Sequence, residues 1–387
     1  METLRGHIWR LQEATEGVLI LKKVLFISNH AGFSKFNAPY FDLFHLLGWR
    51  VDNVSPGLEV GSVDFQFDLD IDRSPLSLKN FRALLKLREL CRENDYDLIH
   101  CHTPVGGLLG RLCTSRRSKT KVVYTCHGLH FFRGSSLASW ILYFPIEWLL
   151  AKRTDLMVLI NREDFELCRR LFKTRTAQID GVGVNLGKFH IGEESERNAR
   201  RLENGFSPDE FLVICVAQLI PRKNLEWLIT SFVNLAKIHP EVRLVLVGDG
   251  PLRGRLEIVL AEKDATRYVK MLGYRTDVNL LYRMADLLVS TSKQEGFPIN
   301  IVEGMASGLP CLCSDIRGHR DIAEKSVSVV LFDPNDYSDF ERKFQGLYET
   351  SGMRSGESIA AAAEQFSVQH SVSQMKALYE LAQSEPL

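Results

Sequence analysis

Ser207-Pro-Asp-Glu-Phe-Leu-Val-Ile-Cys-Val-Ala217 is the stretch of this sequence that decides the fold. Its Ser-Pro-Asp turn leads into an unbroken apolar run, which is typical of a strand buried on both faces of a parallel sheet. The run comes past the middle of a 387-residue chain, after a charge-dense stretch from Glu193 to Asn204. A fresh central strand at this point predicts that a second domain begins here, in keeping with the two or three domains that the length suggests.

Similar short apolar runs occur on both sides of this strand and alternate with amphipathic segments of helical length. This alternation predicts an α/β protein with two doubly wound, Rossmann-like domains that face each other across a cleft. We place a linker at about Val184–Gly205 and expect a ligand beyond the carboxyl ends of the strands, in the cleft. The candidate strands are Lys23–Ser28, Leu98–His100, Val122–Cys126, Leu156–Ile160, Leu212–Ala217, Arg243–Val247, Leu287–Ser290 and Pro310–Cys313.

The chain divides into four parts on this interpretation. Residues 1–17 are mostly polar and lack the apolar core of a signal peptide, so we interpret them as a loosely ordered extension. Residues 18–190 form the first domain and residues 191–365 the second. Residues 366–387 form a C-terminal helix that is expected to pack back toward the first domain.

The composition narrows the classes of function. The formal net charge is +0, which gives no global argument for nucleic-acid binding. No apolar run reaches the ~18–20 residues of a transmembrane helix. The 8 cysteines are scattered through apolar segments without a Cys-x-x-Cys pair, which favours buried, reduced thiols in a cytoplasmic protein over a zinc or redox site.

Glu295-Gly-Phe-Pro-Ile-Asn-Ile-Val-Glu303 is the candidate binding motif. The Gly-Phe-Pro turn places Glu295 on a loop, and Asn300 can open a helix that carries Glu303 about one turn in. Carboxylates accept hydrogen bonds from hydroxyl groups, and the amides of a helix N-terminus bind phosphate, so a nucleotide-sugar would suit both. Taken alone, the same residues also fit a solvated helix entry.

Three further segments place functional residues at strand ends. Arg222 and Lys223 follow the first strand of the second domain, and two adjacent cations suit a diphosphate. Cations at a helix start oppose the helix dipole, so their presence there favours an anionic ligand over a solvated helix start. His127 ends another strand, where it can meet a sugar hydroxyl or be a partly buried histidine bonded to the backbone. Gly32 follows the first strand, where a glycine lets a ligand approach the backbone or simply forms a turn.

Two other patterns carry less weight. His100 and His102 lie on one side of a strand, but no third ligand is near in sequence, so we expect no metal. Gly181-Val-Gly183 and Gly248-Asp-Gly250 do not fit the dinucleotide-binding pattern. The second is better explained as a tight strand end followed by a helix with Pro251 at its first position.

Together these segments resemble the family 4 retaining glycosyltransferases of the GT-B fold, above all bacterial enzymes that build exopolysaccharide, capsule or lipopolysaccharide. The resemblance runs from about Lys23 to the C-terminus. It rests on the order and spacing of Tyr96-Asp-Leu-Ile-His-Cys-His-Thr-Pro-Val-Gly-Gly, Tyr124-Thr-Cys-His-Gly-Leu-His-Phe, Thr154-Asp-Leu-Met-Val-Leu-Ile-Asn-Arg-Glu-Asp, Val245-Leu-Val-Gly-Asp-Gly-Pro-Leu, and Glu295-Gly-Phe-Pro with Glu303-Gly-Met-Ala-Ser-Gly-Leu-Pro.

The resemblance implies a role for each candidate residue. Glu295 would contact the donor sugar near the reacting carbon, His127 would contact the transferred sugar, and Glu303 would hold the ribose hydroxyls. The remaining donor-binding candidates are Gly32 near the phosphates, Arg222 and Lys223 on the diphosphate, Phe297, the backbone amides around Pro298–Ile301, including Asn300 and Ile301, in the phosphate cradle, and Tyr274 and Arg275 beside the base. This chain departs from the family at Gln218, where an arginine is frequent, and Arg222 is the candidate for the missing charge.

The implied function is transfer of a hexose or N-acetylhexosamine from a nucleotide-sugar, expected to be UDP-linked, to a lipid-linked glycan. The acceptor would enter on the face of the leaving group, and the phosphate would take its proton. Neither a protein nucleophile nor a metal or other cofactor is then expected. Two alternatives stay open, namely a UDP-sugar 2-epimerase on the same fold and a non-catalytic partner subunit.

An aromatic segment in the first domain suggests a membrane surface as a further partner. Phe131-Phe-Arg133 and the run from Trp140 to Arg153 carry aromatic residues with basic residues at their flanks. Such a surface could rest on anionic lipid at the inner face of the cytoplasmic membrane, although the Trp140–Leu150 part fits a core helix equally well. The basic residues expected on the same surface are Arg111, Arg116, Arg117, Lys119 and Lys121.

Overall fold

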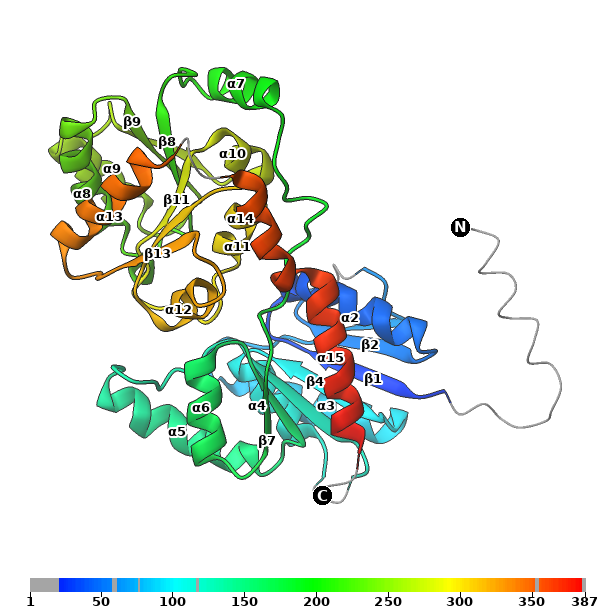
Figure 1. Ribbon diagram of the computed structural model, residues 1–387. Helices are drawn as coiled ribbons and strands as arrows, with labels where there is room; N and C mark the ends of the chain where they lie inside the picture. Colours follow the sequence, from blue (N-terminus) through cyan, green and yellow to red (C-terminus); the bar gives the residue numbers. More distant parts are fainter. Residues whose placement is uncertain (1–20, 58–60, 76, 116–117, 352–354, 385–387) are drawn as a thin grey trace, which may run out of the picture.

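Two parallel sheets organise the chain, and each belongs to its own domain (Figure 1). The structure is a computed structural model that describes residues 21–57, 61–75, 77–115, 118–351 and 355–384. The expected extension over residues 1–17 lies outside the described residues. Strands of both sheets alternate with helices along the chain, which confirms the prediction of two doubly wound domains.

The first domain holds a seven-stranded sheet in which every neighbouring pair of strands is parallel. Its strands are β1 (Lys23–Ile27), β2 (Arg50–Ser55), β3 (Phe65–Asp68), β4 (Leu98–His102), β5 (Lys121–Cys126), β6 (Leu156–Leu159) and β7 (Arg175–Gln178). Their order across the sheet is β3-β2-β1-β4-β5-β6-β7. The helices that connect them are η1 (Ala31–Phe33), α2 (Ser34–Leu46), α3 (Leu78–Asn94), α4 (Pro104–Cys113), α5 (Leu137–Ala151) and α6 (Arg162–Leu171).

The second domain repeats this plan with a six-stranded parallel sheet. Its strands are β8 (Phe211–Val216), β9 (Val242–Val247), β10 (Val269–Gly273), β11 (Leu287–Ser290), β12 (Cys311–Ser314) and β13 (Val329–Phe332), in the order β10-β9-β8-β11-β12-β13. Its helices are α7 (Glu194–Glu203), η2 (Pro221–Lys223), α8 (Leu225–Ile238), α9 (Arg253–Glu262), α10 (Val278–Met284), α11 (Ile299–Ala306), α12 (Arg317–Ala323), α13 (Tyr337–Glu349) and α14 (Gly356–Ala363).

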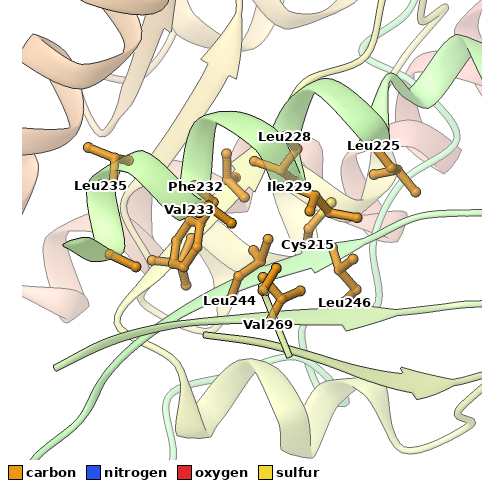
Figure 2. Close-up of a cluster of buried hydrophobic side chains, with 14 of the residues drawn as sticks. Cys215, Leu225, Leu228, Ile229, Phe232, Val233, Leu235, Leu244, Leu246 and Val269 are labelled. Atoms are coloured by element: carbon orange, nitrogen blue, oxygen red, sulfur yellow. The ribbon is translucent and has the colours of Figure 1, made fainter. Parts of the chain in front are cut away.

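Each sheet is covered by helices on both faces, because its strands are apolar on both sides. Figure 2 shows one of these layers, in which Leu228, Ile229 and Phe232 of α8 pack onto Leu244 and Leu246 of β9. The opposite face of the same sheet is covered by α10, α11 and α14. In the first domain α3, α4, α5 and α6 contribute to one face, and α2 covers the other.

The chain passes between the domains twice, and the two passages lie side by side. The amide of Val184 donates to the carbonyl of Phe366 at 2.9 Å, and the amide of Val368 donates to the carbonyl of Val184 at 3.1 Å. Through η3 (Glu364–Phe366) the chain then enters α15 (Val368–Gln383). The helix α15 packs on the first domain (Figure 1). Tyr379 Oη on this helix lies 2.7 Å from His100 Nδ1.

The charged stretch 193–204 differs from the expected linker. It folds into α7, and Arg201 on this helix is buried and donates hydrogen bonds to the carbonyls of Met284, Pro208 and Glu210. Arg201 also pairs with Asp286 at 2.6 Å. The linker prediction is therefore wrong over these residues. The helix packs through a buried arginine whose side-chain nitrogens are all hydrogen-bonded to acceptors, so its sequence is polar and resembles a linker.

The turn after β9 is expected to end the strand tightly and to start a helix at Pro251. Gly248 ends β9 tightly, since a Cβ atom there would lie 2.0 Å from the carbonyl oxygen of Ala217. The next helix, α9, begins only at Arg253, so Pro251 lies in the turn before the helix rather than at its first position.

Candidate functional site

The candidate site lies where each doubly wound sheet reverses its strand order. In the second domain this point falls between β8 and β11, and Lys223 and Glu295 lie in the loops that follow these two strands. In the first domain it falls between β1 and β4, next to the loops that carry Gly32 and His127. Ligands of open α/β sheets bind beyond the carboxyl ends of strands at such points.

Two adjoining cavities occupy this region. A cavity of about 550 Å³ lies against the second domain, and a smaller one of about 210 Å³ lies between the domains. Arg222, Glu295, Phe297 and Ile299 line both cavities. The larger cavity is also lined by the predicted residues Lys223, Tyr274, Arg275, Pro298 and Asn300 and by Gln218, and the smaller one by the predicted residue His127. Most of the predicted residues thus line these two adjoining cavities, whereas Gly32, Ile301 and Glu303 line neither.

Glu295 is paired with both predicted cations. Lys223 Nζ contacts Glu295 Oε1, and Arg222 Nη1 lies 3.0 Å from Glu295 Oε2. Burial of this carboxylate would raise its pKa, but the charges of Lys223 and Arg222 outweigh burial and hold the pKa of Glu295 below its ordinary value. Glu295 is therefore an ionised, buried carboxylate at neutral pH.

The loop after β11 fixes the cations in place. Thr291 Oγ1 donates to the carbonyl of Lys223 at 3.0 Å, and the amide of Lys293 donates to the carbonyl of Arg222 at 2.8 Å. Between these cations and α8, Asn224 adopts a left-handed conformation with φ of 57°. The two cations thus come from the end of β8 and are held by the end of β11.

Glu303 lies in the second half of α11 with surroundings very different from those of Glu295. The helix begins at Ile299, so the amides of Ile299 and Asn300 open it, while the amide of Ile301 donates to the Pro298 carbonyl at 3.1 Å. Tyr282 Oη donates to Glu303 Oε2 at 3.3 Å. Burial raises the pKa of Glu303 to about 7, although Tyr282 and Lys188 partly oppose this rise.

Tyr274 and Arg275 form the outer rim of the larger cavity. Tyr274 is 74% exposed, and its ring is free to meet a planar group. Arg275 is held in a two-pronged pair with Asp277, with Nε–Oδ1 and Nη2–Oδ2 distances of 2.7 and 2.5 Å. This pair fixes the orientation of the arginine, whose Nη1 also lies 3.3 Å from Asn204 Oδ1.

His127 faces the smaller cavity from the first domain. Its Nε2 lies 3.2 Å from Nδ1 of His102, and its ring meets Phe33 edge-on at 4.7 Å between centroids. Burial lowers the pKa of His127 to about 4, so the ring is neutral at physiological pH. Phe33 directly follows Gly32 and also lines this cavity, together with Phe36, which is 40% exposed.

The sequence did not identify several residues of this region. Phe33 and Phe36 form an aromatic pair at 5.6 Å, and their spacing of three along a helical segment was the signal for a shared face. Arg317 and Asp164 form a buried ion pair between the two domains at 2.5 Å. Asp164 belongs to a motif quoted above, but its partner is 153 residues away.

The aromatic segment of the first domain forms α5, a helix with two apolar faces. One face packs inward through Trp140 and Phe144 against Phe131, which is itself 0% exposed. The other face is exposed and consists of Leu137, Ile141, Leu142, Ile146, Trp148 and Leu149.

Two residues assigned to the basic aromatic surface of α5 belong to the core instead. Phe131 is one of them, and Arg111 is the other, because it is buried and paired with Glu147 at 2.7 Å. Arg116 and Arg117 lie outside the described residues.

Among the described residues, no group of three or more metal-ligating side chains lies close enough together to hold a metal ion. In the same ranges, no helix combines the length and apolar character needed to cross a bilayer.

Two family profiles match this chain and together cover both domains. Residues 196–365 match the family described as "Glycosyl transferases group 1", and residues 23–161 match "Glycosyl transferase 4-like". Among curated proteins, the chain is 34% identical over 366 residues to "Putative glycosyltransferase EpsD" of Bacillus subtilis (strain 168), with 92% of this chain and 96% of the relative covered. It is 27% identical over 272 residues to the Escherichia coli "UDP-Gal:alpha-D-GlcNAc-diphosphoundecaprenol alpha-1,3-galactosyltransferase", with 68% and 69% covered.

Solved structures share the whole fold at lower sequence identity. A sucrose-phosphate synthase from Thermosynechococcus elongatus superimposes with a TM-score of 0.77 at 19% identity, covering 93% of this chain and 98% of that chain. Anabaena HepE in complex with UDP and glucose gives a TM-score of 0.74 at 20% identity, covering 93% and 100%. These likenesses confirm the GT-B architecture.

Proposed function

We propose a specific reaction for this chain. The chain belongs to the group 1 glycosyltransferase family, so it is a glycosyltransferase. It transfers a hexose or N-acetylhexosamine from a UDP-sugar to a lipid-linked glycan, with retention of the anomeric configuration. The observation that carries the proposal is the pairing of Glu295 with both Lys223 and Arg222 in the lining of a cavity of about 550 Å³.

The second domain binds the donor in this proposal. Lys223, Arg222 and the first amides of α11 hold the diphosphate, because cations and a helix N-terminus both favour phosphate. Glu303 accepts hydrogen bonds from the ribose hydroxyls, and Tyr274 and Arg275 border the base at the rim. Gln218 lines the same cavity as a neutral side chain, so Arg222 supplies the second positive charge.

The Glu295 ion pairs suggest how the donor organises the site. A diphosphate competes with Glu295 for Lys223 and Arg222, so its binding releases the carboxylate to accept hydrogen bonds from hydroxyls of the donor sugar. As the bond between sugar and phosphate breaks, negative charge grows on the leaving phosphate. The preorganised cations then stabilise the transition state more than the ground state.

The acceptor enters from the first domain. Phe33 and Phe36 offer aromatic faces to a sugar ring beside His127, whose neutral ring can exchange a hydrogen bond with the transferred sugar. The leaving phosphate takes the acceptor proton, so the reaction needs neither a protein nucleophile nor a metal. The E. coli relative is named for a diphosphoundecaprenol acceptor, which supports a lipid-linked acceptor for this chain.

The exposed face of α5 supports binding of this chain to a membrane surface. Its only acidic residue, Glu147, is turned inward to Arg111, so the outward face is apolar and uncharged. Lys152 and Arg153 follow its C-terminal end and line a cavity of about 360 Å³ together with Lys119 and Lys121. We propose that this surface rests on anionic lipid at the inner face of the cytoplasmic membrane.

A transfer assay with variants tests the donor-site proposal. A thermal-shift screen of UDP- and GDP-sugars first identifies the donor, because a bound ligand raises apparent stability. Wild type should then transfer that sugar to polyprenyl-diphosphate-linked N-acetylglucosamine in the presence of EDTA. Lys223→Ala should lose transfer and bind UDP about tenfold or more weakly, since it removes one charged hydrogen-bond donor worth ~1.5–3 kcal/mol.

Glu295→Gln separates the two roles in this site. It should lose transfer but bind UDP at least as tightly as wild type, because both cations are freed for the diphosphate. Near wild-type turnover in either variant would contradict the site assignment. Conversion of UDP-N-acetylglucosamine without an acceptor would instead favour the epimerase.

A further inference from the structure

Arg317 joins the two loops that carry Glu295 and His127. It is the first residue of α12 in the second domain and is only 6% exposed. Its Nε donates to the carbonyl of Glu295 at 3.3 Å, and its Nη2 donates to the carbonyl of Leu129, two residues after His127, at 3.0 Å. One guanidinium group therefore bonds to both sides of the cleft.

The third contact of Arg317 is with Asp164 of the first domain. Arg317 Nη1 lies 2.5 Å from Asp164 Oδ1, and the two side chains are 4% and 1% exposed. The other oxygen of Asp164 accepts from the amide of Leu129 at 2.9 Å and from Asn161 Nδ2 at 2.8 Å. Asp164 thus holds the amide of Leu129, whose carbonyl Arg317 holds.

The two loops touch backbone to backbone at this point. A Cβ atom at Gly296 would lie 2.2 Å from the carbonyl oxygen of His127, and a Cβ atom at Gly128 would lie 3.5 Å from Cα of Gly296. No side chain can separate the loops here. The spacing between Glu295 and His127 across the cleft therefore depends on what keeps these backbones together.

Stability alone does not explain this arrangement. A buried ion pair is often no more stabilising than apolar residues of similar volume, because both charges lose their hydration. A cation in the first turn of α12 also opposes the helix dipole. The planar fork of arginine, in contrast, can reach a carboxylate and two carbonyls at once.

We propose that Arg317 is a positioning residue that locks the His127 loop against the Glu295 loop and so sets the distance across which sugar transfer takes place. This inference rests on the proposed function of the site. It assigns no contact with substrate to Arg317. All nucleotide-binding candidates except Gly32 lie in the second domain, so Arg317 governs turnover rather than nucleotide affinity.

The test compares Arg317→Lys with a matched control in the full-length protein. Lysine keeps the charge but loses the fork, so it cannot hold Asp164 and both carbonyls together. We expect kcat to fall ~10–100-fold, since a misplacement of about 1 Å costs that order of rate. The KM for the UDP-sugar and the affinity for UDP should stay within about twofold.

The control is Arg162→Ala in the same interdomain contact. The Arg162 side chain pairs with Glu324 at 2.9 Å, and both are more than half exposed at 62% and 57%. Exposed ion pairs contribute little to stability, so this variant should keep the domain contact intact and kcat within about twofold. An equal loss in both variants would show that any weakened domain contact lowers turnover, and would overturn the specific role of Arg317.

Hydrogen exchange tests the inference without the transfer assay. Arg317→Lys and Asp164→Asn should each speed exchange at the amide of Leu129, while Arg162→Ala should leave it unchanged. Unchanged exchange in both variants would overturn the inference even if wild type transfers no sugar. A parallel loss of UDP affinity and kcat would also overturn it, because it would indicate general misfolding.

Discussion

Glu295 and Glu303 are carboxylates eight positions apart whose pKa values lie on opposite sides of the ordinary value. Burial acts on both in the same direction. At Glu295 two adjacent cations overcome it, whereas Glu303 has a single tyrosine hydroxyl and a more remote lysine. Different environments thus prepare one carboxylate as a permanent anion and leave the other close to its titration point at neutral pH.

The pKa of Glu303 predicts a pH dependence of donor binding. The ionised form accepts hydrogen bonds from two ribose hydroxyls, so binding favours loss of the proton. With a pKa of about 7, affinity for a UDP-sugar should rise about tenfold from pH 6 to pH 8 and then level off. Calorimetric titration at several pH values measures this rise. The diphosphate of a UDP-sugar carries no group that titrates in this range.

Glu303→Gln provides the control for this prediction. The amide cannot ionise, so the affinity should be weaker overall and flat between pH 6 and pH 8. A slope that persists in this variant would place the titrating group elsewhere.

Single residues also mark the limit of what the sequence predicts. Glu295, Lys223 and Glu303 lie in segments with turn, helix and strand signals close by, and the chemistry of each could be argued locally. Arg317 and Asp164 have ordinary local surroundings, and only the fold brings them together. Arg111 was misplaced for a related reason, because a basic residue near other basic residues suggests a surface until its buried partner, Glu147, is known.

At the scale of elements, hydrophobic periodicity predicts central strands well and polar elements poorly. The eight candidate strands all have counterparts in the two sheets. The unpredicted strands include β3 and β7, which form the edges of the first sheet and carry polar residues. The helix α7 was missed because its packing relies on Arg201 rather than on an apolar stripe.

The helix α5 differs from α7 in having more apolar surface than its packing uses, because it is apolar on two faces and only one is covered. Its free face predicts binding to anionic vesicles. Leu142 and Leu149, 57% and 56% exposed, lie seven residues apart and so share a side of the helix. Replacing both with glutamate should weaken vesicle binding at low salt about tenfold or more, because each buried leucine contributes ~1.5–3 kcal/mol.

Leu202→Glu on α7 is the matched control, since Leu202 is 63% exposed in the second domain. It should sediment with phosphatidylglycerol-containing vesicles as wild type does. If the wild-type protein stays in the supernatant at low salt, the membrane proposal is contradicted.

At the scale of the whole molecule, the two passages of the chain hold the domains at a fixed spacing. Gly183 adopts a left-handed conformation with φ of +83°, directly before the bridge between Val184 and Ser367. A Cβ atom at Gly183 would lie 2.6 Å from Cα of Val368, which is backbone and cannot rotate away. The close approach of the passages therefore requires glycine at this position.

Gly183→Ala should consequently destabilise the protein through both strain and collision. The unfavourable backbone conformation alone costs about 1–3 kcal/mol, and the collision must push the start of α15 away from the first passage. Urea unfolding should show a lower midpoint for this variant. Gly346→Ala is the control, because Gly346 lies inside α13 with no atom within 4 Å of its Cβ position, so alanine should raise stability by up to about 1 kcal/mol. Opposite signs for the two substitutions would support a passage that depends on glycine, whereas a Gly183→Ala variant as stable as wild type would mean that the two passages are free to move apart.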